Sequence, residues 1–167
     1  KYLALLRGIN VSGKNKIKMQ ELRQLLSDQG LNNVQTYIQS GNVVFESTAS
    51  TQVLSQEIEQ AILTHYGFEV PVLVQTKTEL NQLIEVNPFL PNRSEDIRYL
   101  ALAFLENIPQ QDLIKTIGTE PYLPDEWQVQ KKGIFLYCPN GFGRTKLTNN
   151  FFERKLKTRA TTRNWKT

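Results

Sequence analysis

The order of segments in the first 77 residues constrains the fold more than any other feature of this 167-residue chain. Predicted strands, rich in apolar and β-branched residues, occupy residues 2–7, 34–39, 43–47 and 70–76. Between them, apolar residues three or four apart predict one helix ending at Gly30 and another ending at Gly67. With a tight turn at Ser40-Gly41-Asn42, this is the order of the ferredoxin-like, split βαβ arrangement.

The second half repeats this order less completely. A capping box over residues 76–79 predicts a short helix, and the proline-containing residues 87–96 are the expected link between the halves. Further predicted elements are a strand at 98–105, a helix at 109–118, strands at 127–130 and 134–138, and a helix capped by Thr148. From Thr161 onward we weigh a last helix, with Trp165 as a core anchor, against a ligand contact.

These patterns predict an α+β protein made of two ferredoxin-like (α/β-plait) halves. The halves are residues 1–77 and residues 78–167, the second being a degenerate copy with a basic C-terminal segment. Each half has an antiparallel sheet with its helices packed on one face. In such a sheet we expect the turn at residues 40–42 to lie at the end opposite to the loop that follows the first strand.

Positive charge is concentrated at both ends of the sequence. Residues 1–23 hold six Lys or Arg and one acid, and residues 131–167 hold ten and one. The residues between them hold four bases and fourteen acids, which leaves the whole chain at +4. Basic surfaces attract phosphates, nucleic acids or acidic membranes, whereas solvated basic ends are the alternative interpretation.

Composition also bears on location and cofactors. No run of eighteen apolar residues is present, and the apolar stretch at residues 3–6 is too short for a secretory signal, so we expect neither a membrane span nor a membrane partner. One cysteine excludes an internal disulfide and indicates the cytoplasm. One histidine and one cysteine provide no metal-ligand cluster, and we predict no metal and no cofactor.

The residues that usually carry acid-base or nucleophilic catalysis have simpler explanations. His65 is expected on the surface near the end of a helix, and Cys138 alternates with apolar residues as a small core residue. The acid pairs at residues 95–96 and 125–126 fall in turn-like stretches, where acids are usually solvated. Catalytic residues, and whether the protein is an enzyme at all, are therefore left open.

Four polar loops contain the residues that packing does not explain. They are "RGINVSGKNKIKM" at 7–19, "YIQSGNVVF" at 37–45, "CPNGFGRTKLT" at 138–148 and "TRATTRNWKT" at 158–167. The first and third lead from a strand into a helix, where backbone amides and lysines suit an anion. The predicted ligand-binding residues are Arg7, Asn10, Lys14, Lys16, Ser40, Asn42, Arg144, Lys146, Thr148, Arg163 and Asn164.

The segments "LLRGINVSGKNKIKM", "TYIQSGNVVF", "GFGRTKLT" and "TTRNWKT" also resemble, in this order, the signature segments of a bacterial family known only as domain of unknown function 1697. The resemblance implies a ferredoxin-like architecture and a soluble bacterial protein, and it carries no established activity. Ser12 stands where members often have glycine, and Lys166 stands where asparagine is common.

These observations favour binding of a phosphate-bearing ligand through basic, glycine-containing loops. A nucleotide, a phosphometabolite and a nucleic-acid backbone all remain candidates. The usual RNA-recognition mode is disfavoured because the first and third strands of the first half offer only Tyr2 and Phe45 as aromatics. The alternatives are a protein-protein assembly module, in which the chain forms an oligomer, and a phosphoryl- or nucleotidyl-transfer enzyme.

Overall fold

In the computed structural model of the protein, residues 1–167 are described, except for the side chains of residues 92–96. The chain divides into two compact units, Lys1–Leu80 and Asn81–Thr167. The expected boundary between residues 77 and 78 falls at the start of helix α3 (Lys77–Glu85). This helix continues across the division between Leu80 and Asn81. Residues 87–96 were the expected link, but they lie inside the second unit.

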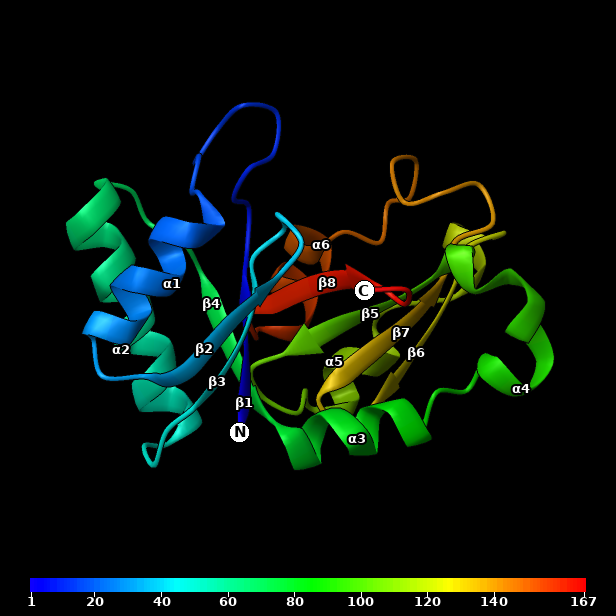
Figure 1. The fold of residues 1–167 in the computed structure, drawn as a ribbon. Coiled ribbons are helices and arrows are strands. Elements are labelled where there is room, and N and C mark those ends of the chain that lie inside the picture. The colour runs from blue at the N-terminus through cyan, green and yellow to red at the C-terminus, as the bar shows by residue number, and fades with distance from the viewer. The chain divides into compact units, whose positions relative to one another are not determined.

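The first unit has the predicted order of elements (Figure 1). They are β1 (Tyr2–Leu6), α1 (Met19–Asp28), β2 (Asn32–Tyr37), β3 (Asn42–Glu46), α2 (Thr51–Tyr66) and β4 (Val72–Thr76). The sheet order is β2-β3-β1-β4, and every neighbouring pair is antiparallel. Each strand-helix-strand segment thus has a strand of the other segment inserted between its own two strands, as the split βαβ prediction requires.

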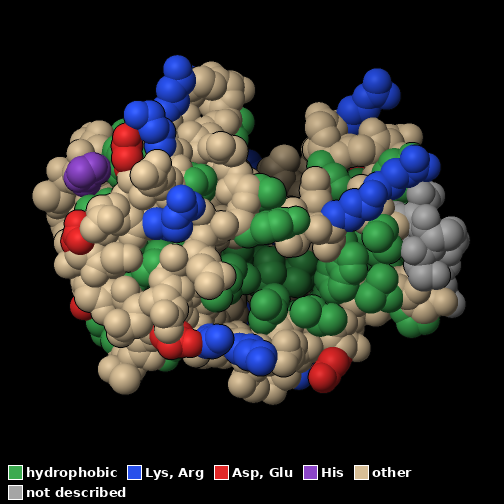
Figure 2. Space-filling view, in the orientation of Figure 1, with side chains coloured by type: hydrophobic (Ala, Val, Ile, Leu, Met, Phe, Trp, Pro, Cys, Tyr) green, Lys and Arg blue, Asp and Glu red, His purple; other side chains and the backbone are tan. Residues whose placement is uncertain are grey.

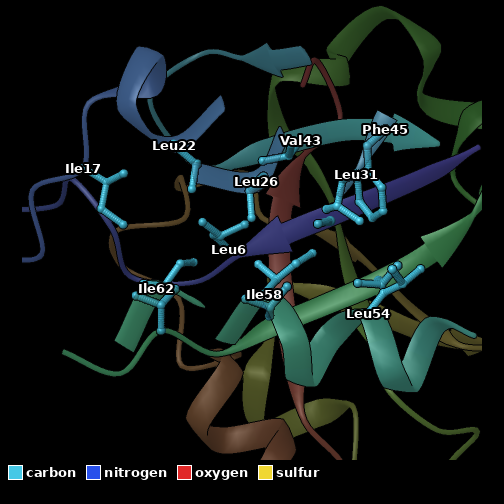
Figure 3. Close-up of a cluster of buried hydrophobic side chains, with 14 of the residues drawn as sticks. Leu6, Ile17, Leu22, Leu26, Leu31, Val43, Phe45, Leu54, Ile58 and Ile62 are labelled. Carbon is cyan, nitrogen blue, oxygen red and sulfur yellow. The ribbon is translucent and has the colours of Figure 1, made fainter. Parts of the chain in front are cut away.

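One face of this sheet packs on both helices. Alternate strand residues such as Leu6, Val43 and Phe45 point to the same face, where they meet leucines and isoleucines of α1 and α2 (Figure 3). The contributing helix residues include Leu22, Leu26, Leu54, Ile58 and Ile62, all at most 1% exposed. Burial of one such side chain stabilises the fold by about 1.5–3 kcal/mol. The apolar residues whose spacing predicted the two helices are therefore the helix residues that form this core.

Local signals set the ends of the helices. Ser50 caps α2 by accepting a hydrogen bond from the Val53 amide, and Gly67 ends that helix at φ 77°. The predicted capping box of α3 is also present. The Glu79 carboxylate accepts hydrogen bonds from the amide and hydroxyl of Thr76, while the Glu79 amide donates to that hydroxyl at 3.1 Å. The stop at Gly67 and the capping box were predicted from sequence because they depend on residues close together in the chain.

The second unit is a more complete repeat than predicted. After α4 (Leu90–Arg93) and a 3₁₀ turn η1 (Ser94–Tyr99), its elements are β5 (Leu100–Leu105), α5 (Gln111–Lys115), a 3₁₀ turn η2 (Glu120–Tyr122), β6 (Glu126–Gln130), β7 (Gly133–Tyr137), α6 (Asn149–Leu156) and β8 (Ala160–Asn164). Its sheet order, β6-β7-β5-β8, matches that of the first unit strand for strand.

The last helix considered from Thr161 is wrong, because those residues form β8. This strand pairs antiparallel with β5, and Ala160 lies in the core of the second unit. Consecutive β-branched threonines favour an extended chain, and the pairing with β5 decides the outcome. Trp165 follows the strand half-buried, with its ring centroid 6.3 Å from that of Phe135.

Candidate functional site

The loop between β1 and α1 is an ordered hairpin. Val11 and Lys14 form an isolated β-bridge, with the Lys14 amide donating to the Val11 carbonyl at 3.0 Å. Ser12 and Gly13 between them have φ values of 51° and 76°. Positive φ at both central positions is typical of a type I′ turn. In Figure 1 this loop is the blue segment that extends beyond the end of β1.

The side chain of Asn10 fixes the base of this hairpin. Its Nδ2 donates to the carbonyls of Ile17 and Gln39, both at 2.9 Å, and its Oδ1 accepts from the Ile17 amide at 2.9 Å. Both amide hydrogens are thereby used within the first unit. Asn10 accordingly ties the loop to itself and to the turn between β2 and β3.

That turn lies at the same end of the sheet as the loop, and the expectation that it lies at the opposite end is wrong. The Leu6 amide donates to the Gly41 carbonyl at 2.8 Å, and Asn10 contacts Gln39. The physical reason is strand direction. Both β1 and β2 run antiparallel to β3, so they point the same way and their carboxyl ends share one end of the sheet.

Gly41 is required by this close approach. A Cβ atom there would lie 2.7 Å from Leu6 Cβ and 2.9 Å from Ile9 Cδ1, and the residue has a φ of 80°. The two predicted ligand residues beside it are engaged in the turn. Asn42 is buried, and its amide group donates to the Tyr37 carbonyl and the Ser40 hydroxyl at 3.1 and 3.0 Å.

The cations of this loop differ in their surroundings. Lys14 and Lys16 are exposed, and within the described part of the chain their side chains form no hydrogen bond or ion pair. Lys18 pairs with Glu21 at 2.9 Å, and the half-buried Arg7 is engaged in a contact of its own. Figure 2 shows Lys and Arg side chains standing out from the surface over this loop. The loop thus presents two lysines to solvent on a fixed backbone.

In the second unit, the loop between β7 and α6 carries the third predicted cluster. Thr148 caps α6, as predicted, by accepting a hydrogen bond from the Phe151 amide at 3.2 Å. Arg144 and Lys146 are exposed and, like Asn140, line a cavity of about 320 Å³. Residues 121–125, which precede β6, form its other wall.

The fourth cluster lies on β8. Arg163 is opposite Leu102 of β5, and burial lowers the pKa of its guanidinium to about 10. Asn164 is opposite Ala101, so its side chain leaves the sheet from the other face. The amides of Cys138 and Trp165 donate to the carbonyls of Tyr99 and Leu100. The start of the β7–α6 loop and the end of β8 therefore flank the start of β5.

Groups considered for catalysis lie mostly where the sequence placed them. His65 is exposed in the last turn of α2. Cys138 is buried in the second core, and burial raises the pKa of its thiol to about 11. The side chains at 95–96 lie outside the described residues. Asp125, expected to be solvated, is half-buried and lines the cavity.

Sequence reasoning missed this cavity because its walls come from segments far apart in the chain. Tyr122 and Asp125 belong to none of the four predicted loops, and the pairing of β6 with β7 brings their segment to the β7–α6 loop. Among the residues with described side chains, no group of three or more His, Cys, Asp or Glu could hold a metal ion. None of the helices in this part of the chain has the length and apolar character needed to cross a membrane.

Comparison with known proteins identifies similar chains without a described activity. A family model described as "Protein of unknown function (DUF1697)" matches residues 1–135, which include two of the four resemblance segments. The structure of the conserved bacterial protein SP0830 from Streptococcus pneumoniae is similar, with 30% sequence identity and a TM-score of 0.72. That similarity covers 99% of this chain and 92% of the other. No protein with a curated description matches.

Proposed function

The chain belongs to the family described as protein of unknown function DUF1697, and for this member we propose that the β1–α1 loop binds a phosphate-bearing ligand. The observation that carries the proposal is the pair of exposed lysines, Lys14 and Lys16, on an ordered hairpin. A loop held in one conformation loses little entropy when it binds, so its charges contribute more of their attraction to affinity.

The distribution of charge in the first unit supports this proposal. Lys1–Leu80 holds seven basic and seven acidic residues, so the unit is neutral as a whole. Residues 7–23 nevertheless hold five bases and one acid, and that acid, Glu21, pairs with Lys18. The remainder of the unit is correspondingly negative. An anion is thus attracted to one end of the unit, the end at which the β1–α1 loop and the β2–β3 turn meet.

The start of α1 adds to this attraction. Its N-cap residue is Lys18, which makes no side-chain capping hydrogen bond to the first turn. Amides at a helix start favour negative charge by about 0.3–1 kcal/mol where exposed. Asn10 orders the loop in this proposal, and Arg7, Lys14 and Lys16 provide the charge. The loop is open, which suits a nucleotide, a phosphometabolite or a nucleic-acid backbone.

The test is a binding series on matched variants of the whole chain. Fluorescence anisotropy with short labelled RNA and DNA at several salt concentrations, and thermal shifts with nucleotides, compare Lys14→Gln and Lys16→Gln with Lys77→Gln. The control Lys77 is exposed, and it lies in α3 rather than in the loop. For nucleic acid, each loop variant is expected to lower the salt slope by about 1, and the control leaves it unchanged. Equal binding by all three variants contradicts the proposal.

Assembly is a second candidate function, favoured by the edge strand β2. This strand is at the outside of its sheet and carries no charged residue. Tyr37, Ile38 and Val44 near it are 54%, 49% and 41% exposed. An uncharged edge can pair with the same edge of a second copy. Light scattering tests this candidate. Tyr37→Lys is expected to convert a dimer to a monomer, and a monomeric wild-type protein excludes it.

Phosphoryl transfer is less well supported. That chemistry calls for a carboxylate that holds a metal ion near the phosphate. Residues 7–20 contain no acid, and the first acid of α1, Glu21, is paired with Lys18. Binding without transfer is therefore the form of the proposal.

A further inference from the structure

A cavity in the second unit differs from the open loop of the first unit in having two walls. It measures about 320 Å³ and lies between residues 121–125 and the β7–α6 loop. Small-molecule sites range from about 300 to 1,000 Å³, so this one has the size for a small metabolite. Both walls are held by backbone hydrogen bonds, among them Asp125 to Tyr122 at 2.9 Å and Arg144 to Gly141 at 3.2 Å. Each wall is thus held in a local turn of its own.

We propose that this cavity is a binding site for a small phosphate monoester whose body carries hydroxyl groups. Two cationic side chains, Arg144 and Lys146, line it. Among the residues whose side chains are described, neither has a hydrogen-bond or ion-pair partner. A phosphate monoester carries about −1.5 to −2 charge at neutral pH, so it matches two cations better than a single carboxylate does. Asn140 adds an amide donor at the same wall.

Asp125 specifies the other end of the ligand. It lines the same cavity, is half-buried, and forms no ion pair with Arg144 or Lys146. A carboxylate repels phosphate and accepts hydrogen bonds from donors. A ligand that satisfies both ends has its phosphate at the cations and a hydroxyl group at Asp125. Inorganic phosphate and unphosphorylated polyols each satisfy only one end.

The aromatic wall limits how the ligand body can lie. Tyr122 lines the cavity, and its ring packs edge-on against Phe151 of α6 with the centroids 5.2 Å apart. The ring of Phe151 in turn packs on that of Phe152 in the core, with the ring centroids 5.3 Å apart. A ring held in this way offers a fixed apolar surface to the carbon face of a sugar or polyol. This site does not depend on the function proposed for the first unit.

Calorimetric titration of the full chain with ribose 5-phosphate as the probe tests the site. Wild type and Arg154→Gln are expected to bind equally, because Arg154 is exposed in α6 and does not line the cavity. Arg144→Gln is expected to weaken binding at least about tenfold. Asp125→Asn is expected to weaken ribose 5-phosphate while leaving inorganic phosphate unchanged or tighter, since a negative charge is removed. Lys77→Gln, in the first unit, is expected to have no effect, because Lys77 is exposed in α3 and does not line the cavity.

Three results overturn the proposal. One is a wild-type protein that binds ribose 5-phosphate no better than inorganic phosphate. Another is equal affinity in Arg144→Gln and Arg154→Gln. The third comes from amide chemical-shift mapping of the wild-type protein, which decides the question if a variant fails to fold. Probe-induced shifts that lie away from residues 121–125 and 138–147 contradict the proposal. Because these results concern residues 121–125 and 138–147 of the second unit, failure here is distinct from failure of the function proposed for the first unit.

Discussion

The two units share a strand order but place their basic loops at different ends of their sheets. In the first unit the long loop follows β1 and spans residues 7–18, whereas the corresponding connection after β5 is residues 106–110. In the second unit the long loop follows β7, residues 138–148, and its counterpart after β3 is residues 47–50. Because β1 and β3 are antiparallel, these are opposite ends of one topology. The fold leaves open which connection is lengthened, and each unit has lengthened a different one.

The two long loops also differ in how they are held. The β1–α1 loop is tied to a neighbouring turn by Asn10 and by the close packing of Leu6 and Ile9 on Gly41. The β7–α6 loop is held by local turns, such as Gly141 to Cys138 at 2.9 Å, and by the cap of α6. Substitutions in the first loop should therefore cost more stability than matched substitutions in the second.

The largest effect is expected for Gly41→Ala. The new Cβ would overlap Leu6 and Ile9, and φ of 80° strains any residue with a side chain. Overpacking typically costs about 1–3 kcal/mol, and the backbone strain adds about 1 kcal/mol. The matched control is Gly143→Ala, where no heavy atom lies within 4 Å of the Cβ position, and there we expect a change below about 0.5 kcal/mol.

Urea unfolding can separate the units in this experiment. Both tryptophans, Trp127 and Trp165, belong to the second unit, so fluorescence follows that unit and far-ultraviolet circular dichroism follows both. Gly41→Ala should lower the unfolding midpoint seen by circular dichroism. Equal stability of the two glycine variants would mean that the first loop is no more tightly packed than the second.

The next largest effect is expected for Asn10→Ala. The substitution removes three hydrogen bonds and leaves an alanine at φ 55°. Because some of the freed groups are exposed to water, we expect a loss of about 2 kcal/mol. Asn140→Ala, in the second loop, is the matched control, with an expected change below about 0.5 kcal/mol. Amide exchange at residues 11–17 should accelerate only in Asn10→Ala. Unchanged exchange there would show that the hairpin stands without this side chain.

A smaller effect is expected for Thr148→Ala, which removes the cap of α6. Loss of a threonine N-cap typically costs about 1 kcal/mol, and Thr148→Ser should retain most of the stability because serine caps equally well. The corresponding cap of α2 is Ser50, so Ser50→Ala gives the same measurement in the first unit. Unfolding followed by tryptophan fluorescence should shift for Thr148→Ala. If the alanine and serine variants are equally stable, the hydroxyl contributes nothing.

Sequence patterns predicted the features that depend on neighbouring residues. The strands and helices of the first unit, the capping box at Thr76 to Glu79, the cap at Thr148, and the buried position of Cys138 follow from spacing and propensity. Strand β8 was missed because its threonines and arginine show no apolar alternation, and only pairing with β5 fixes it. Predicting that the β1–α1 loop and the β2–β3 turn lie at the same end of the first sheet requires the strand directions to be traced correctly.

Nonlocal pairing likewise explains which parts of the candidate sites were predictable. Arg144 and Lys146 are predicted as ligand residues because glycines and bases cluster before a helix. Asp125 and Tyr122 complete the cavity. They lie about twenty residues before Arg144 and Lys146 in the chain, with the β6–β7 hairpin between. Asn10 is predicted as a ligand-binding residue, and in the structure its side chain stabilises the loop through hydrogen bonds. A polar residue type alone does not distinguish a ligand contact from a structural contact.

The smallest effect is expected at Ser12, and it tests the turn type directly. Ser12 has φ 51° and precedes Gly13 at φ 76°, so both central positions of this turn are left-handed. In the second loop Gly141 has a positive φ of 84°, and its neighbour Asn140 does not. Asparagine tolerates this conformation best after glycine, and Asn-Gly is the preferred type I′ pair. Ser12→Asn should therefore stabilise the first unit by a few tenths of a kcal/mol.

Ser12→Ala supplies the opposite case, because alanine lacks the polar side chain that makes a left-handed residue tolerable. The expected order of stability is asparagine above serine above alanine, within a total range of about 1 kcal/mol. Paired urea melts followed by circular dichroism, with amide exchange at residues 11–14, measure it. The reverse order would show that the turn relaxes to another type in solution. Lys14 would then lose the fixed position on which the phosphate proposal depends.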